Sequence, residues 1–129
     1  PVNFARTTAS ASTSSIANNA SANLDITSVA KAYGLLKIQT SVAAYVCLYT
    51  SQAARTQDAN RQITTDPNPG AGVIAEVMTS AGGTQIISPM LMGYNDEATP
   101  IDTVYAKVIN AHGSASVVTV TLHYIPFET

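Results

Sequence analysis

The chain has 129 residues, a length that favours one domain able to bury a core without disulfides or metal. Only 11% of the residues are charged, the net charge is −2, and the six Lys and Arg residues are scattered along the chain. Because no basic stripe exists to neutralise phosphates, this composition argues against nucleic acid as a partner.

The single cysteine and the short apolar runs exclude further classes of protein. One thiol cannot form an internal disulfide or a Cys-based zinc site, and Cys47 lies in an apolar run, so we predict a buried side chain. No apolar run approaches the ~20 residues of a membrane helix. The N-terminus lacks the basic-then-apolar layout of a signal peptide. We therefore expect a chain made in a cytoplasm, with no membrane partner.

The first 23 residues differ in composition from the rest. They are rich in Ser, Thr, Ala and Asn, and alone they would bury too little surface to offset their ordering entropy. They could form a floppy tail, or an arm that orders against a neighbouring subunit. The near-absence of charge favours the arm, because solvated tails are usually charged or proline-rich. We predict an arm over residues 1–23, with Val2, Phe4 and Ile16 as interface residues.

Residues 24–50 have the patterns of three strands. "LDITSVA" alternates apolar and polar residues at its start, and "GLLKIQT" (34–40) places Leu36 and Ile38 on one face. "AAYVCLYT" (43–50) is apolar on both faces, as expected for a strand buried in a sandwich or an interface.

The next segment holds the one helix candidate, "SQAARTQDANR" (51–61), and a loop rich in proline and glycine. Glycine-rich loops before strands or helices often cradle phosphates. Here Val73 and Ile74 follow the glycines in place of a P-loop's Lys-Ser/Thr, and the β-rich run 72–79 follows in place of a helix. We interpret residues 66–72 as consecutive structural turns.

Strand signals continue to the end of the chain. "TQIISPMLMGY" (84–94) contains Pro89, which predicts an edge strand, a bulge or a bend. Apolar residues of a half-buried strand then alternate with polar ones: Val118, Val120, Leu122 and Tyr124. We predict that they form a β-hairpin with a preceding strand carrying Val104, Ala106 and Val108. The hairpin loop would hold an odd number of residues and include Gly113.

Short strands, Gly/Pro-rich turns and little helix predict an all-β fold. We expect an antiparallel β-sandwich, jelly-roll-like, formed by residues 24–129 as one domain, with residues 1–23 as an extended N-terminal arm.

The titratable residues show no recognisable catalytic or metal-binding pattern. The acids of the predicted loops are Asp58, Asp66, Asp96, Glu97 and Asp102. "DAN" (58–60) lacks the glycine and distal glutamate of a calcium loop, and "YNDEATP" (94–100) could offer oxygens to a surface cation, but solvated loop charge is the simpler interpretation. His112 and His123 would lie at opposite ends of the predicted hairpin. We predict a protein that is not an enzyme, with no catalytic, cofactor-binding or metal-binding residues.

Tyrosines supply the remaining candidate contacts. Tyr45 and Tyr49 share one face of the predicted strand 43–50, where they could pack in the core or anchor a subunit interface. Tyr94 could contact a protein or stack on a sugar. We predict Tyr45, Tyr49 and Tyr94 as interface residues.

Four stretches of the sequence form a recognisable set: "LLKIQT" (35–40), "AYVCLYT" with "AARTQDANR" (44–61), "TTDPNPGAGVIAEV" (64–77) and "YNDEATP" (94–100). Together they resemble a family of small virion proteins of tailed bacteriophages, including cyanobacterial phages. The resemblance covers about residues 32–125, most of the chain outside the predicted arm.

This resemblance implies a structural role, as a capsid decoration (cement) protein on the exterior of the virion capsid, made in the host cytoplasm. Such proteins are often jelly-roll-like, associate as homotrimers, bind the major capsid protein across capsomers and commonly use a terminal arm. The alternative is a tail, knob or fibre module that binds host-surface glycans. The family carries no catalytic residues that could be transferred to this chain.

Overall fold

The computed structural model describes residues 4–80 and 83–129, with the side chains of residues 88 and 89 excepted. The described chain contains eight strands and one short helix: β1 (Thr7–Ile16), β2 (Ser21–Ile26), β3 (Ala32–Thr40), β4 (Ala44–Tyr49), α1 (Gln52–Gln57), β5 (Val73–Met78), β6 (Thr84–Tyr94), β7 (Val104–Asn110) and β8 (Ser116–Glu128). Within these residues, no helix has the length and apolar character needed to cross a membrane.

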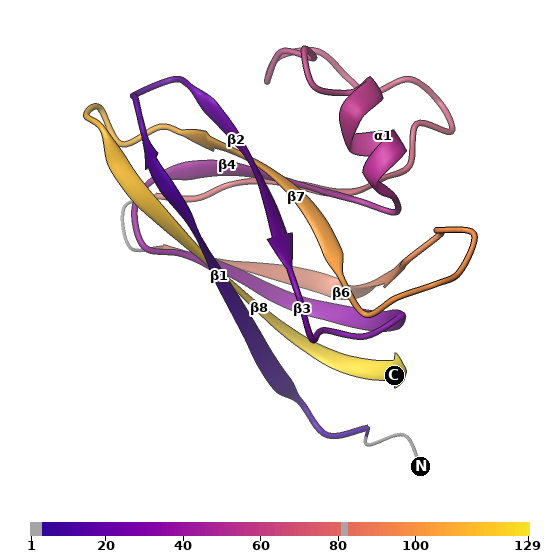
Figure 1. Cartoon of the computed structure of the whole chain (residues 1–129). Helices are drawn as coiled ribbons and strands as arrows, with labels where there is room; N and C mark the ends of the chain where they lie inside the picture. Colours follow the sequence, from indigo (N-terminus) through magenta and orange to yellow (C-terminus); the bar gives the residue numbers. More distant parts are fainter. Residues whose placement is uncertain (1–3, 81–82) are drawn as a thin grey trace.

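The strands form two four-stranded antiparallel sheets that pack face to face (Figure 1). Sheet A has the order β1-β8-β3-β6, and sheet B has the order β2-β7-β4-β5. The predicted antiparallel β-sandwich is therefore confirmed. The helix predicted within residues 51–61 is also confirmed as α1, which lies on the side of sheet B in Figure 1.

Four of the strand pairs follow one rule, and the pairs β3–β8 and β4–β7 then join them into sheets. The first four strands pair in reverse order with the last four: β1 with β8, β2 with β7, β3 with β6, and β4 with β5. The chain is thus a long hairpin, with α1 and the turn-rich loop at its tip, wound into two sheets. This winding gives the eight-stranded jelly roll.

The predicted hairpin of the last two strands is wrong. β7 pairs with β2 and β4 in sheet B, whereas β8 pairs with β1 and β3 in sheet A. The apolar faces of β7 and β8 do meet, but across the core between the sheets. Alternation identifies the face that a strand buries, and it does not distinguish a partner beside the strand from one opposite it.

The core fills the space between the two sheets with alternating residues of their inner faces. Fully buried members include Leu35, Ile38 and Leu122 from sheet A, and Val46, Leu48 and Val108 from sheet B. Each such side chain stabilises the fold by about 1.5–3 kcal/mol relative to an exposed position.

The N-terminal segment is part of the sandwich, which corrects the predicted boundary between an arm and a domain. β1 pairs with β8 over most of its length, and β2 pairs with β7. Ile16 is buried in the core, and the Thr13 hydroxyl accepts a hydrogen bond from the backbone N–H of Val118 at 3.0 Å. The segment gains its ordering energy from strand pairing and from the few side chains that it buries, Thr13 and Ile16.

A register shift in β3 separates Leu36 from Ile38, which were predicted to share one face of the strand. Leu35 and Ile38 point into the core, whereas Leu36 lies at the irregularity between Leu35 and Lys37 and remains partly exposed. The partner strand β6 is an edge strand, as the proline in its sequence predicted. Its own irregularity falls between Ile86 and Leu91, the stretch that contains this proline.

Candidate functional site

A group of interacting ionisable side chains lies on the outer face of sheet B, under α1 and the loop that follows it. We call this set the Asp58–Arg61 cluster: Tyr45, Cys47, Tyr49, Asp58, Arg61, Glu76 and Lys107. The strands place Lys107, Cys47 and Glu76 in one row across β7, β4 and β5. Tyr45 and Tyr49 lie on the same face of β4, on either side of Cys47.

Local hydrogen bonds position α1 and the turn that follows it, which together cover the cluster. Ser51 caps α1, since its hydroxyl accepts the N–H of Ala54 at 3.1 Å. The helix ends at Asp58, and the N–H of Arg61 then donates to the Asp58 carbonyl at 3.1 Å. This turn directs the Asp58 and Arg61 side chains onto the sheet.

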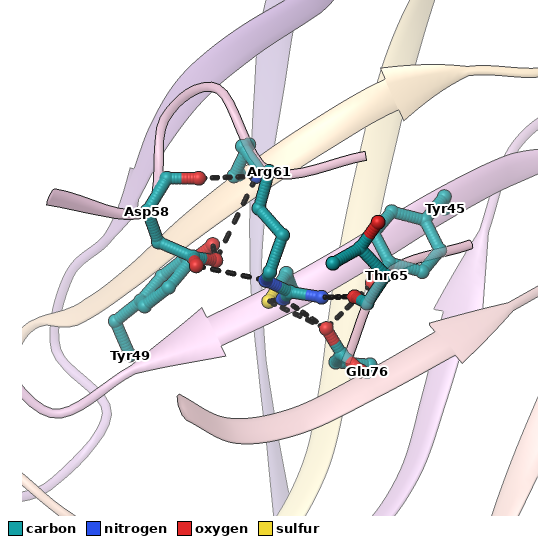
Figure 2. Close-up of polar contacts among 8 residues, drawn as sticks. Tyr45, Tyr49, Asp58, Arg61, Thr65 and Glu76 are labelled. Atoms are coloured by element: carbon teal, nitrogen blue, oxygen red, sulfur yellow. Dashed lines mark hydrogen bonds and ion pairs between the residues drawn. The ribbon is translucent and has the colours of Figure 1, made fainter. Parts of the chain in front are cut away.

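Figure 2 shows how the cluster is connected. Arg61 contacts Asp58, with Nε 2.8 Å from Oδ1, and its guanidinium also pairs with Glu76. It donates further to the carbonyl of Thr65 at 2.7 Å. Tyr49 donates to Asp58 Oδ2 at 2.5 Å, and Tyr45 donates to Glu76 Oε1 at 2.7 Å. Arg61 Nη2 also donates to Cys47 Sγ at 3.5 Å, so one side chain joins the loop to β4 and β5.

The same network sets the ionisation states of the cluster. Burial opposes ionisation of Asp58, but hydrogen bonds from Arg61 and Tyr49 and the charges of Arg61 and Lys107 outweigh it, so the pKa of Asp58 lies below its ordinary value. Burial raises the pKa of the Cys47 thiol to about 11. At neutral pH the cysteine is a protonated thiol, which is a poor nucleophile. The contacts of Arg61 and Asp58 hold residues 52–65 against the outer face of sheet B.

A second buried cation, Arg55 in the last turn of α1, holds the helix against sheet B. Arg55 donates through Nη1 to the Asp25 carboxylate at 2.7 Å and to the carbonyls of Leu24 and Ala106 at 3.3 Å each. Its guanidinium carbon also lies 5.3 Å from the centroid of the Tyr105 ring. Lys107, buried in the cluster itself, donates to the Asp58 carbonyl at 2.9 Å.

The outer face of sheet A is open, in contrast to that of sheet B. One row across its four strands consists of Thr8, His123, Lys37 and Ile86. A neighbouring row contains Ile125, Gly34 and Met92. At Gly34, a Cβ would stand 2.2 Å from the Met90 sulfur, so the glycine lets Met90 lie across the face. Exposed apolar side chains from the edge strand border this face: Ile86, Met90, Met92 and Tyr94.

The "YNDEATP" loop is held by one buried side chain, Asn95. Its amide donates to the Thr103 carbonyl at 2.9 Å, and its oxygen accepts the N–H groups of Glu97 and Ile101. Tyr94 and Asp96 flank an open pocket of about 360 Å³ that is also lined by Gly70, Gly72 and residues of α1. Across residues 4–80 and 83–129, no three His, Cys, Asp or Glu side chains are grouped so that they could hold a metal ion.

The turn-rich loop before β5 packs closely against the start of α1. Gly70 and Gly72 have φ values of 75° and 80°, which glycine adopts without strain. A Cβ at Gly72 would lie 2.7 Å from the Thr50 hydroxyl and 2.9 Å from the Ala54 Cβ. The loop therefore brings its backbone close to the start of α1, as expected of a structural turn.

The predicted interface residues have different fates. Val2 lies outside the described residues. Phe4 is exposed and contacts Phe127, and Tyr94 is exposed on β6. Ile16 is in the core instead of at an interface. Tyr45 and Tyr49 are 6% and 1% exposed, covered by their own chain, so the structure does not place them on a surface that a neighbour could reach.

Two features escaped the sequence-based prediction. Asp58 was expected to be a solvated loop charge, yet it is buried and paired. The three-residue spacing of Asp58 and Arg61 in a helix candidate was the available signal. The open row on sheet A depends on cross-strand register, which alternation alone does not determine.

The comparisons with known proteins add no family to this picture. No protein-family model matches the chain, and no curated protein matches it either.

Proposed function

We propose that this chain is a non-enzymatic structural protein of a phage virion, a capsid decoration protein that binds the major capsid protein across capsomers. The observation that carries the proposal is the contrast between the two outer faces of the sandwich. Much of the outer face of sheet B is covered by α1 and the loop that follows it, whereas the outer face of sheet A is bordered by four exposed apolar side chains of its edge strand: Ile86, Met90, Met92 and Tyr94. The resemblance of residues 32–125 to small phage virion proteins supports the same conclusion.

The exposed face of sheet A has the properties of a binding surface. Ile86 and Met92 are 63% and 56% exposed, and both project from the outer face of β6. Contiguous apolar surface of this kind typically marks a protein contact. A stable contact buries about 800 Å² per partner, and repetition over a lattice or within a homotrimer adds avidity to each one.

The covered part of sheet B suits a structural role in a particle. Three buried cations tie the tip of the long hairpin to sheet B: Arg55, Arg61 and Lys107. Such buried, paired side chains keep the surface shape constant from copy to copy. A shell component that must fit the same site repeatedly benefits from this constancy.

A second candidate function rests on the pocket beside Tyr94. An exposed tyrosine ring next to the Asp96 carboxylate and the polar side chains of Ser51 and Gln57 has the makings of a sugar site, with one stacking surface and several hydrogen-bonding groups. This observation favours a tail, knob or fibre module that binds host-surface glycans.

The copy number per virion separates the two candidates. We expect quantitative mass spectrometry of purified virions to find hundreds of copies, because a decoration protein occupies a repeated position on the shell. A count of about six or twelve would instead match the rotational symmetry of a tail or vertex. That result would reject the decoration role and leave the glycan-binding module as the account of the chain.

A further inference from the structure

The free positive charge of the chain is concentrated on the open face. Of the six Lys and Arg residues, Arg55, Arg61 and Lys107 form ion pairs with acids of the described chain. No ion pair involving the other three is present among the described residues. Two of these three, Arg6 and Lys37, line the same pocket, and the third, Lys31, does not.

The pocket is an open hollow of about 370 Å³ on the outer face of sheet A, lined by Arg6, Thr7, Thr8, Leu36, Lys37 and His123. Strand register places Lys37 directly opposite His123 and Thr8 on the other side of His123. The imidazole Nε2 lies 3.5 Å from Gln39 Oε1, which places the ring at the border of the pocket. Lys37 on β3, His123 on β8, Thr8 on β1 and Arg6 just before β1 therefore border one hollow.

We propose that this pocket binds carboxylate groups of an acidic protein segment. Arg and Lys recognise carboxylates through charge-assisted hydrogen bonds, and threonine hydroxyls can donate to the remaining oxygen lone pairs.

The surroundings of the pocket favour an acidic peptide over a free inorganic anion. Ile86 continues the row of Lys37 toward the edge strand, and Met92 and Ile125 lie in the neighbouring row. A free phosphate would contact only the polar groups, whereas a peptide can add apolar contacts with these side chains. β6 is also an edge strand, and an edge offers backbone groups to an extended chain. Only the identification of this segment with a shell protein rests on the proposed function.

The test uses the isolated chain and three probes: the capped peptide Leu-Glu-Glu-Leu, its Leu-Gln-Gln-Leu counterpart, and inorganic phosphate. Binding is followed by amide chemical shifts in NMR at about 20 mM salt, where screening of charges is weak. We expect saturable shifts at Thr8, Lys37 and His123 with the glutamate peptide. The glutamine peptide and phosphate should each bind at least about tenfold more weakly, as expected when charge-assisted or apolar contacts are lost.

Two neutralising variants supply a matched comparison. Lys37→Gln should raise the Kd of the glutamate peptide about tenfold, because one charge-assisted hydrogen bond is lost. Lys31→Gln removes the same charge outside the pocket and should leave the Kd within about twofold, as for a surface charge that does not contact the ligand. Equal losses in both variants, or no saturable shifts, would overturn the site. Tighter binding of phosphate than of the peptide would overturn the acidic segment as its ligand. All of these results are independent of whether the chain sits on a capsid.

Discussion

Replacing Asp58 with alanine is expected to lower the free energy of unfolding by about 3–5 kcal/mol, the cost of removing one partner from a buried ion pair. The carboxylate accepts from Arg61 and Tyr49, and Lys107 lies 3.8 Å from it. Without Asp58, both cations keep their burial and lose their shared counter-charge. Urea unfolding of the variant, followed by circular dichroism, measures the difference.

Asp66→Ala is the matched control, because Asp66 is exposed in the loop that follows and should change stability by less than about 0.5 kcal/mol. The pH profile adds a second readout. The pKa of Asp58 is lowered in the folded state, so its stabilisation is present above the unfolded-state value of about 3.9 and is lost as pH falls through the folded-state pKa. The wild-type chain should therefore lose more stability below about pH 4 than Asp58→Ala does. Equal stability of Asp58→Ala and wild type at pH 7 would show that the cluster does not fasten the loop.

Deletion of residues 1–16 is expected to prevent stable folding. The deletion removes β1, which pairs with β8, and takes away the buried Ile16 side chain and the Thr13 bond to Val118. It exposes the edge of a 13-residue strand, and an exposed edge of that kind promotes aggregation. We expect the truncated chain to lose its cooperative thermal transition or to accumulate in the insoluble fraction.

Deletion of residues 1–5 provides the comparison, because it ends before β1 begins. This shorter deletion should keep a cooperative transition. A soluble, cooperatively folding chain that lacks residues 1–16 would mean that β1 is an accessory arm, as the composition of the segment first suggested.

The sequence alone predicts the burial pattern of this fold better than its pairing. The double apolar face of residues 43–50, the helix at 51–61 and the edge character of 84–94 all follow from local patterns, and the structure confirms them. The partner of β8 does not follow, because β1 is 100 or more residues away and carries mostly small polar side chains. Serine and alanine have little strand preference of their own, and here the Ser10 and Ser12 hydroxyls form hydrogen bonds with those of Thr121 and Thr119 on β8.

The candidate sites were less predictable for the same reason. Tyr45 and Tyr49 were correctly placed on one face, but the segment that covers that face comes from elsewhere in the chain. The pocket of Arg6, Lys37 and His123 joins three strands whose register is a property of the whole fold. Residues that meet only through long-range pairing carry no local signal of their meeting.

Binding of the purified chain to capsids that lack it tests the central claim most directly. The informative variant is the double substitution Ile86→Ser and Met92→Ser on the open face. Its matched control, Ile63→Ser and Met78→Ser, changes another exposed isoleucine and methionine, 41% and 48% exposed, on the side of sheet B. We predict that wild type and the control co-sediment with capsids, whereas the open-face variant binds at least about tenfold more weakly, the effect of losing central apolar contacts. Wild-type protein that stays in the supernatant, or equal binding by all three proteins, would contradict the account.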